Sequence, residues 1–185
     1  MNNEKYTYLS LWIFLVFCTP LKAQEDRPSF VLDVPYVATP ENIVDEMLDM
    51  AGVSAKDVLY DLGSGDGRIP IRAAITVGAR GIGIDLNPER VREAIKNAKE
   101  AEVTDKVSFY EGDVFEVDFS EASVLTLYLF PEVNLKLRPR IQKMAPGTKI
   151  VSHNYDMGDW EPDLTKEIMG PDGRKHVLYL WKIPD

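Results

Sequence analysis

One short stretch, residues 58–67, constrains the fold of this chain more than any other part of it. It reads VLYDLGSGDG, an apolar run that ends in an acid and is followed by glycine at every second position. The apolar residues of the next segment, RIPIRAAITV, have helical spacing. Glycines at a strand-to-helix turn let the backbone approach a ligand where any side chain would clash. The stretch therefore predicts an α/β sheet with a ligand at the carboxyl end of this strand.

Strands and helices alternate along the rest of the chain. Helices are expected at residues 40–51, 68–77, 88–101 and 131–144, with Thr39 as the cap of the first. Strands are expected at residues 58–62, 81–86, 107–110, 123–130 and 149–153, and a final hairpin at 164–169 and 176–183. Alternation that ends in a hairpin predicts one domain, a doubly wound, Rossmann-like α/β fold whose seven-stranded sheet ends in an antiparallel hairpin.

The first 23 residues differ in kind from the rest. Lys5 precedes an apolar run over residues 9–18, and the small residue Ala23 follows. This pattern is typical of a secretory signal peptide cut after Ala23, and the run is shorter than the roughly 20 apolar residues of a membrane span. We expect an exported protein, periplasmic or secreted; the alternative is an uncleaved anchor in which residues 6–21 associate with a membrane. A segment over 24–39 then precedes the α/β domain over 40–185.

Composition excludes several kinds of site. The net charge of −9 argues against a nucleic-acid partner, because nonspecific binding depends on Lys and Arg that neutralise phosphates. With Cys18 as the only cysteine and His153 and His176 as the only histidines, we expect no metal site. The sequence indicates no oligomeric state.

Acidic residues follow three successive strands. Asp85 closes the second strand, 24 residues after Asp61, and Asp113 follows the third. Because parallel strands present their carboxyl ends at one edge of the sheet, these carboxylates should converge beside the glycine loop. There the carboxylates can accept hydrogen bonds from hydroxyl and amino groups of a ligand or bind an ammonium group. The predicted ligand-binding residues are Asp61, Gly63, Gly65, Asp66, Asp85 and Asp113.

The glycine loop differs from the dinucleotide fingerprint G-x-G-x-x-G. It reads G-x-G-x-G after an acid, and in this form it resembles the cofactor loop of class I (seven-strand) S-adenosylmethionine-dependent methyltransferases. VPYV at 34–37, DLGSGDGRI at 61–69 and IDLNP at 84–88 together resemble a narrower family. Its members are protein-lysine methyltransferases of the mitochondrial adenine nucleotide translocase and ATP synthase c subunit, with bacterial relatives. The resemblance, over roughly residues 33–162, implies S-adenosyl-L-methionine as cofactor and a protein lysine as acceptor.

Three residues are candidates for catalysis. By the resemblance, Tyr36 helps to close the cofactor and lysine site. His153 and Asp156 follow the fifth strand, where either can orient the acceptor or take its proton. A lysine must lose its proton before it reacts, and an apolar slot would favour that loss. The aromatic candidates for such a slot are Tyr36, Tyr128, Phe130 and Trp160.

Two other functions stay open on the sequence. Enzymes that methylate base amino groups carry an Asn/Asp-Pro-Pro-aromatic loop after the fourth strand, whereas this chain has YLFP at 128–131, which again argues against a nucleic acid. Acceptor pockets on this fold vary widely, so one alternative is a methyltransferase of a small molecule or lipid. The other is an exported, non-catalytic module that binds a nucleoside-like ligand, since S-adenosylmethionine is made in the cytoplasm.

Overall fold

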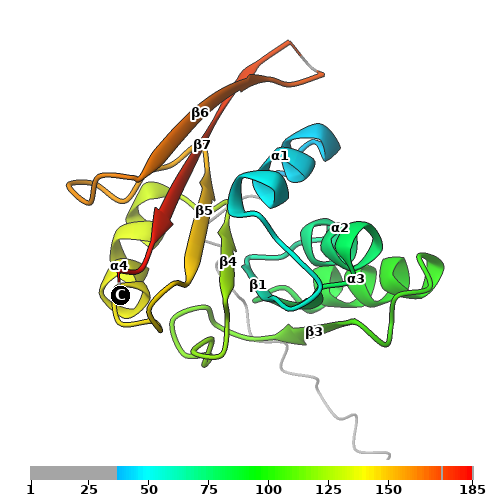
Figure 1. The fold of residues 1–185 in the computed structure, drawn as a ribbon. Coiled ribbons are helices and arrows are strands. Elements are labelled where there is room, and N and C mark those ends of the chain that lie inside the picture. Colours follow the sequence, from blue (N-terminus) through cyan, green and yellow to red (C-terminus); the bar gives the residue numbers. More distant parts are fainter. Residues whose placement is uncertain (1–36, 172, 185) are drawn as a thin grey trace, which may run out of the picture.

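A seven-stranded sheet forms the centre of the computed structural model, which describes residues 37–171 and 173–184 (Figure 1). Its strand order is β3-β2-β1-β4-β5-β7-β6. The strands are β1 (Val58–Leu62), β2 (Arg80–Asp85), β3 (Val107–Glu111), β4 (Val124–Leu127), β5 (Lys149–His153), β6 (Leu164–Met169) and β7 (Lys175–Lys182). The first five pair in parallel, and β7 pairs antiparallel with β5 and β6. The predicted doubly wound sheet with its final hairpin is confirmed.

Helices cover both faces of this sheet. The helices are α1 (Glu41–Ala51), α2 (Arg68–Val77), α3 (Pro88–Glu100) and α4 (Pro131–Ile141). Helices α1, α2 and α3 lie on one face and α4 lies on the other (Figure 1). Successive strand residues point to opposite faces, so Leu59 packs with α1 and α2 whereas Tyr60 packs with α4. Both faces are therefore apolar, which explains the continuous apolar run of β4.

The prediction of a strand over 123–130 was wrong at its carboxyl end. Strand β4 ends at Leu127, which pairs with Leu62 of β1 and Ser152 of β5. Strand β1 ends at Leu62 because the glycine loop begins there, so β4 has no further partner on that side. Residues 128–130 leave the sheet, and Tyr128 thereby reaches the carboxyl edge.

The prediction of Thr39 as a helix cap was also wrong. Pro40 occupies the N-cap position of α1, without a side-chain cap. Thr39 is buried, and its hydroxyl lies 3.2 Å from Nδ1 of His153. Because the Thr39 hydroxyl contacts His153, it does not cap α1. The contact joins the start of the domain to the end of β5.

The amino-terminal predictions fall largely outside the described residues. The signal or anchor over 1–23, the possible membrane contact of 6–21 and all but the last three residues of the segment 24–39 lie there. Among residues 37–171 and 173–184, no helix has the length and apolar character needed to span a membrane.

Candidate active site

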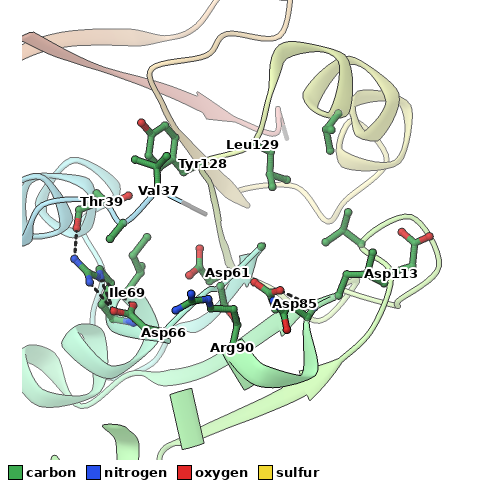
Figure 2. A pocket seen from close by; sticks show the side chains of 18 of the residues that line it. Val37, Thr39, Asp61, Asp66, Ile69, Asp85, Arg90, Asp113, Tyr128 and Leu129 are labelled. Atoms are coloured by element: carbon green, nitrogen blue, oxygen red, sulfur yellow. Dashed lines mark hydrogen bonds and ion pairs between the residues drawn. The ribbon is translucent and has the colours of Figure 1, made fainter. Parts of the chain in front are cut away.

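A cavity of about 280 Å³ opens at the carboxyl edge of the sheet (Figure 2). It lies beside β1 and β4, where the chain crosses to opposite faces through α2 and α4, and ligands bind at such switch points. Thr39 and Tyr128 lie on one side of it and Asp113 on the other, with Asp61 and Asp85 between them (Figure 2). The cavity thus gathers residues that the sequence separates by more than 80 positions.

The glycine loop forms one wall of this cavity with bare backbone. Gly63 and Gly67 both have φ of +79°, in the left-handed region that other residues rarely adopt. A Cβ at Gly67 would lie 2.6 Å from the Phe109 ring, and one at Gly63 would lie 2.6 Å from Leu129. The N–H of Gly63 donates to the carbonyl of Ile84 at 2.8 Å. The loop is therefore bonded to β2 at Gly63 and packs, at Gly63 and Gly67, more closely than a side chain would allow.

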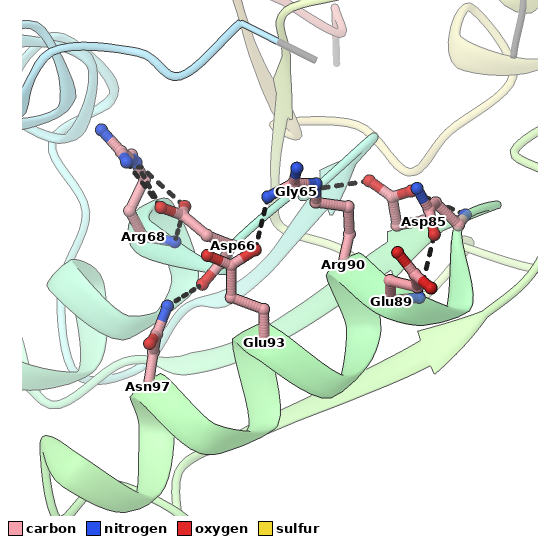
Figure 3. Close-up of polar contacts among 9 residues, drawn as sticks. Gly65, Asp66, Arg68, Asp85, Glu89, Arg90, Glu93 and Asn97 are labelled. Carbon is pink, nitrogen blue, oxygen red and sulfur yellow. Dashed lines mark hydrogen bonds and ion pairs between the residues drawn. The ribbon is translucent and has the colours of Figure 1, made fainter. Parts of the chain in front are cut away.

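The carboxylate of Asp85 is fixed by the backbone on both of its oxygens. Oδ2 accepts from the N–H of Gly65 at 2.8 Å and Oδ1 from the N–H of Asn87 at 2.9 Å (Figure 3). Each oxygen of an ionised carboxylate has a second acceptor site, so Asp85 can still take hydrogen bonds from a diol in the cavity.

Helix α3 supports the glycine loop through a contact that the sequence reasoning missed. Asn97 donates from Nδ2 to the carbonyl of Asp66 at 2.9 Å (Figure 3). Its only signal in the sequence is a polar residue beside the inward-facing Ala94 and Ala98. Asp66 itself accepts from Arg68 Nε at 2.9 Å, and Arg68 Nη1 donates to the carbonyl of Thr39 at 2.8 Å. The loop is thereby joined to the wall formed by residues 37–39.

Asp61 is a carboxyl group almost wholly removed from solvent. Only 3% of it is exposed, and it accepts a hydrogen bond from the Thr126 hydroxyl at 2.7 Å. Burial, opposed by the hydrogen bond from Thr126 and assisted by the negative charges of Asp85 and Asp66, raises the pKa of Asp61 to about 7. A cation beside Asp61 would offset both effects, so this end of the cavity favours a positively charged group.

The six predicted cofactor residues lie around this one cavity. Asp61, Gly63, Asp66, Asp85 and Asp113 line it, and Gly65 acts behind it through Asp85. Asp113 is exposed and caps its own turn by accepting from the N–H of Phe115 at 2.8 Å.

The three predicted catalytic residues are placed differently. His153 lies behind the cavity wall, fully buried, with its ring 3.9 Å from that of Tyr128 and its Nε2 2.8 Å from Nδ1 of His176. Burial, together with a smaller contribution from the charge of His176, lowers the pKa of His153 to about 3. Asp156 is exposed and accepts from the N–H of Gly158 at 3.0 Å, away from the cavity lining. Tyr36 lies outside the described residues.

The comparison with protein families decides which kind of site this is. A family described as "ANTKMT methyltransferase domain" matches residues 61–164, from the acid before the glycine loop to the start of β6. The chain belongs to this methyltransferase family. The family resemblance predicted from the three sequence segments is thereby confirmed.

Relatives of this methyltransferase are named either as protein-lysine methyltransferases or as an RNA methyltransferase. A protein-lysine N-methyltransferase of Saccharolobus islandicus is 45% identical over 159 residues, which cover 84% of this chain and 97% of that one. The adenine nucleotide translocase lysine N-methyltransferase of Mus musculus is 31% identical over 155 residues, 82% of this chain and 66% of that one. A Salinibacter ruber protein described as an RNA methyltransferase, whose crystal structure contains S-adenosyl-L-homocysteine, is 56% identical in sequence to this chain. The two structures superpose with a TM-score of 0.76 over 80% of this chain and 95% of that one.

S-adenosylmethionine is accordingly the cofactor of this methyltransferase, as predicted. The cavity fits that group on its own evidence. A side chain at Gly63 would collide with Leu129 in the cavity lining, and Asp85 presents a fixed carboxylate for a ribose diol. The buried carboxyl of Asp61 suits a cation such as the ammonium of the methionine part. The role of each individual residue stays a prediction.

Proposed function

We propose that this methyltransferase acts on lysine side chains of a protein. The observation that carries the proposal is the 45% identity to a protein-lysine N-methyltransferase over nearly the whole of that relative. The match to the ANTKMT methyltransferase domain family and the 31% identity to the mouse adenine nucleotide translocase enzyme support it. The acidic character of the chain, with a net charge of −9, suits a basic acceptor.

The described residues suggest how the cofactor is held. Asp85 would accept from the ribose hydroxyls, Asp113 lies at the adenine end, and Asp61 would face the ammonium group. When bound, S-adenosylmethionine supplies a methyl group that forms a bond to the acceptor nitrogen as its bond to sulfur breaks, the electron pair staying on sulfur and the acceptor having lost one proton to water. Residues of this chain therefore act by position, and well-oriented reactions gain about 7–11 kcal/mol in this way.

His153 is better suited to positioning than to proton transfer. A group with a pKa of about 3 is a weak base near neutral pH, where an effective general base needs a pKa close to the working pH. Its ring supports the Tyr128 ring and contacts the Thr39 hydroxyl, and both of these residues line the cavity. We infer that neutral His153 holds the cavity wall in place.

RNA is the second candidate acceptor, because the Salinibacter ruber relative at 56% identity is described as an RNA methyltransferase. Two basic residues of α4 that could contact phosphates already serve the fold. Arg138 donates to the carbonyl of Met157 at 2.8 Å, and Arg140 donates to the carbonyls of Phe115 and Val117 at 2.6 and 2.5 Å. These contacts and the net charge favour protein over RNA.

Transfer of an isotopically labelled methyl group from S-adenosylmethionine to a bacterial lysate tests the proposal. We expect the label in protein, sensitive to proteinase, and located on lysine by mass spectrometry. Label sensitive to ribonuclease would favour RNA, and label in lipid or small molecules would favour the other enzyme alternative. Cofactor binding without any transfer would favour the non-catalytic module. The Asp85→Ala variant serves as the control for enzyme-independent label.

We also propose that residues 1–23 direct export of the chain. The charged start, the apolar run and the small residue at Ala23 support this. Expression of the chain with its own amino terminus, followed by fractionation and mass measurement, tests it. A soluble product that begins at Gln24 outside the cytoplasm is expected; an uncleaved product in the membrane would favour the anchor, and an uncleaved product in the cytoplasm would overturn export.

A further inference from the structure

We propose that the acceptor lysine reaches the cofactor cavity through an aromatic slot made by Tyr128, Phe130 and Tyr155, and that Asn154 is the residue that positions this slot. This inference rests on the lysine acceptor proposed above and adds where the lysine side chain enters. The sequence reasoning missed Tyr155 and Asn154, because nothing in their local sequence places them beside Tyr128.

The three rings form a contiguous group at the ends of two neighbouring strands. Tyr128 and Phe130 follow β4, and Tyr155 follows β5. The Tyr155 ring stacks with that of Tyr128 at a centroid distance of 6.2 Å and meets that of Phe130 edge-on at 6.1 Å. All three are half-buried rather than buried, and Tyr128 lines the cofactor cavity (Figure 2). The group is therefore connected to the cavity through Tyr128 and is partly accessible to solvent.

Asn154 fixes the geometry of this group. It has φ of +63°, a left-handed conformation that asparagine adopts more readily than most residues other than glycine. Its N–H donates to the carbonyl of Val177 at 2.7 Å and its Oδ1 accepts from the N–H of Val177 at 3.0 Å. Its Nδ2 donates to the Tyr128 hydroxyl at 3.3 Å. Asn154 thus ties Tyr128 to the neighbouring hairpin.

The Tyr155 backbone is held from below by two further side chains. The Ser152 hydroxyl donates to the Tyr155 carbonyl at 2.6 Å, and Asn134 of α4 donates from Nδ2 to the same carbonyl at 3.3 Å. Both Ser152 and Asn134 are fully buried. These hydrogen bonds fix the Tyr155 backbone and so limit where the Tyr155 ring can lie, as a binding slot requires.

The chemistry of the slot suits an alkylammonium group. Aromatic faces attract a cation, and partial removal from water lowers the pKa of an amine toward the neutral form that reacts. Exposed acids follow the rings at Glu132 and Asp156, which favours the approach of a basic chain. The Trp160 ring, by contrast, packs against the Trp181 ring at a centroid distance of 5.7 Å and against the core cluster, so it does not belong to the slot. The Trp160 backbone carbonyl accepts a hydrogen bond from the Trp181 indole N–H at 2.8 Å.

Binding without turnover gives the first test. Tetralysine is titrated by calorimetry into the full chain saturated with S-adenosylhomocysteine, in about 0.15 M salt to screen distant surface charges. Loss of one cation–π contact predicts about tenfold weaker binding for Tyr155→Ala, whereas Tyr155→Phe should stay within about threefold of the wild type. Asn154→Gly permits the same backbone conformation without the side chain, and we expect it to weaken binding by about threefold or more. The exposed Tyr110 of β3 lies outside the cavity lining, so Tyr110→Ala is the matched control and should bind like the wild type.

Transfer kinetics on the lysate protein acceptor complete the test. Tyr155→Ala and Asn154→Gly should raise the KM for the protein while the affinity for S-adenosylmethionine, measured separately, stays unchanged and shows that the fold is intact. If wild type methylates lysine and both variants bind tetralysine and transfer as well as wild type, the slot proposal is overturned while the proposed function stands. If wild type labels RNA or lipid and no lysine, both are overturned.

Discussion

The proposed cofactor side of the cavity, around Asp85, and the proposed acceptor side, around Tyr128, are built in different ways. On the cofactor side, Asp85 is held by N–H groups of residues 65 and 87, within 20 positions of it, and the glycines supply the shape. On the acceptor side, Thr39 meets His153 across 114 positions, and Asn154 meets Tyr128 across 26. The first side is determined by local backbone geometry, and the second by side chains that only the finished fold brings together. Changes on the two sides should therefore differ in kind.

The largest effect is expected for Asp85→Ala on the cofactor side. Hydrogen bonds to a charged group contribute about 1.5–3 kcal/mol each, so losing those to the ribose should weaken S-adenosylmethionine binding by about 100-fold or more. Calorimetry on the full chain measures this. Glu111 pairs in register with Asp85 on β3 but is exposed and outside the cavity lining, so Glu111→Ala should bind normally. If Asp85→Ala bound S-adenosylmethionine as tightly as the wild type, Asp85 would not be a cofactor-binding residue.

Comparing Gly67→Ala with Gly173→Ala should separate the cost of a steric clash from the cost of backbone strain. The new Cβ would lie 2.6 Å from Phe109 and 2.8 Å from Ala94, so we expect a loss of about 2–3 kcal/mol in the free energy of unfolding. Gly173 has a similar φ of +74° but no atom within 4 Å of its Cβ position. Gly173→Ala should then cost only about 1 kcal/mol, the strain alone. Chemical denaturation of both variants measures the difference, and equal losses would show that the close approach is unimportant.

The affinity for S-adenosylmethionine should depend on pH through Asp61. Its pKa is about 7 in the free protein, and a bound ammonium group would lower it, so binding must release a proton below pH 7. Affinity should therefore rise about tenfold per pH unit from about pH 5 toward 7 and then level off. Asp61→Asn should bind weakly at every pH and lose this slope. A wild-type affinity that does not change below pH 7 would place the ammonium group elsewhere.

The same raised pKa gives a signed prediction for stability without cofactor. The folded pKa of Asp61, about 7, lies above the ordinary aspartate pKa of 3.8, so the folded state binds more protons between these values. Its contribution to stability is fully present below about pH 4 and is lost as the pH rises through 7. Denaturation midpoints of wild type and Asp61→Asn, compared across this range, measure the contribution. Parallel curves for the two proteins would contradict it.

The contrast between the two sides also explains what the sequence could predict. Asp61, Asp85 and Asp113 were placed correctly at neighbouring strand ends because strand order and direction follow from alternation and apolar runs. The carboxyl end of β4 could not be predicted from the sequence, because an apolar run does not show where the neighbouring strands stop pairing with it. The positions of Asn154 and Tyr155 beside Tyr128 could not be predicted, since they depend on how β5 pairs with β4 and β7.

The smallest effect is expected for His153→Asn on the acceptor side. If His153 positions the wall through Thr39 and Tyr128, its replacement by a shorter polar side chain should lower kcat by less than about tenfold, with the pH profile unchanged in shape. A general base at this position would instead lose about 100-fold or more, together with the acid limb of the profile. Rate measurements from about pH 5.5 to 9, with the protein acceptor at saturation, distinguish the two. A large loss of kcat with a changed pH profile would show that His153 transfers the proton. It would also mean that cofactor and substrate raise the pKa of His153 far above its value in the free protein.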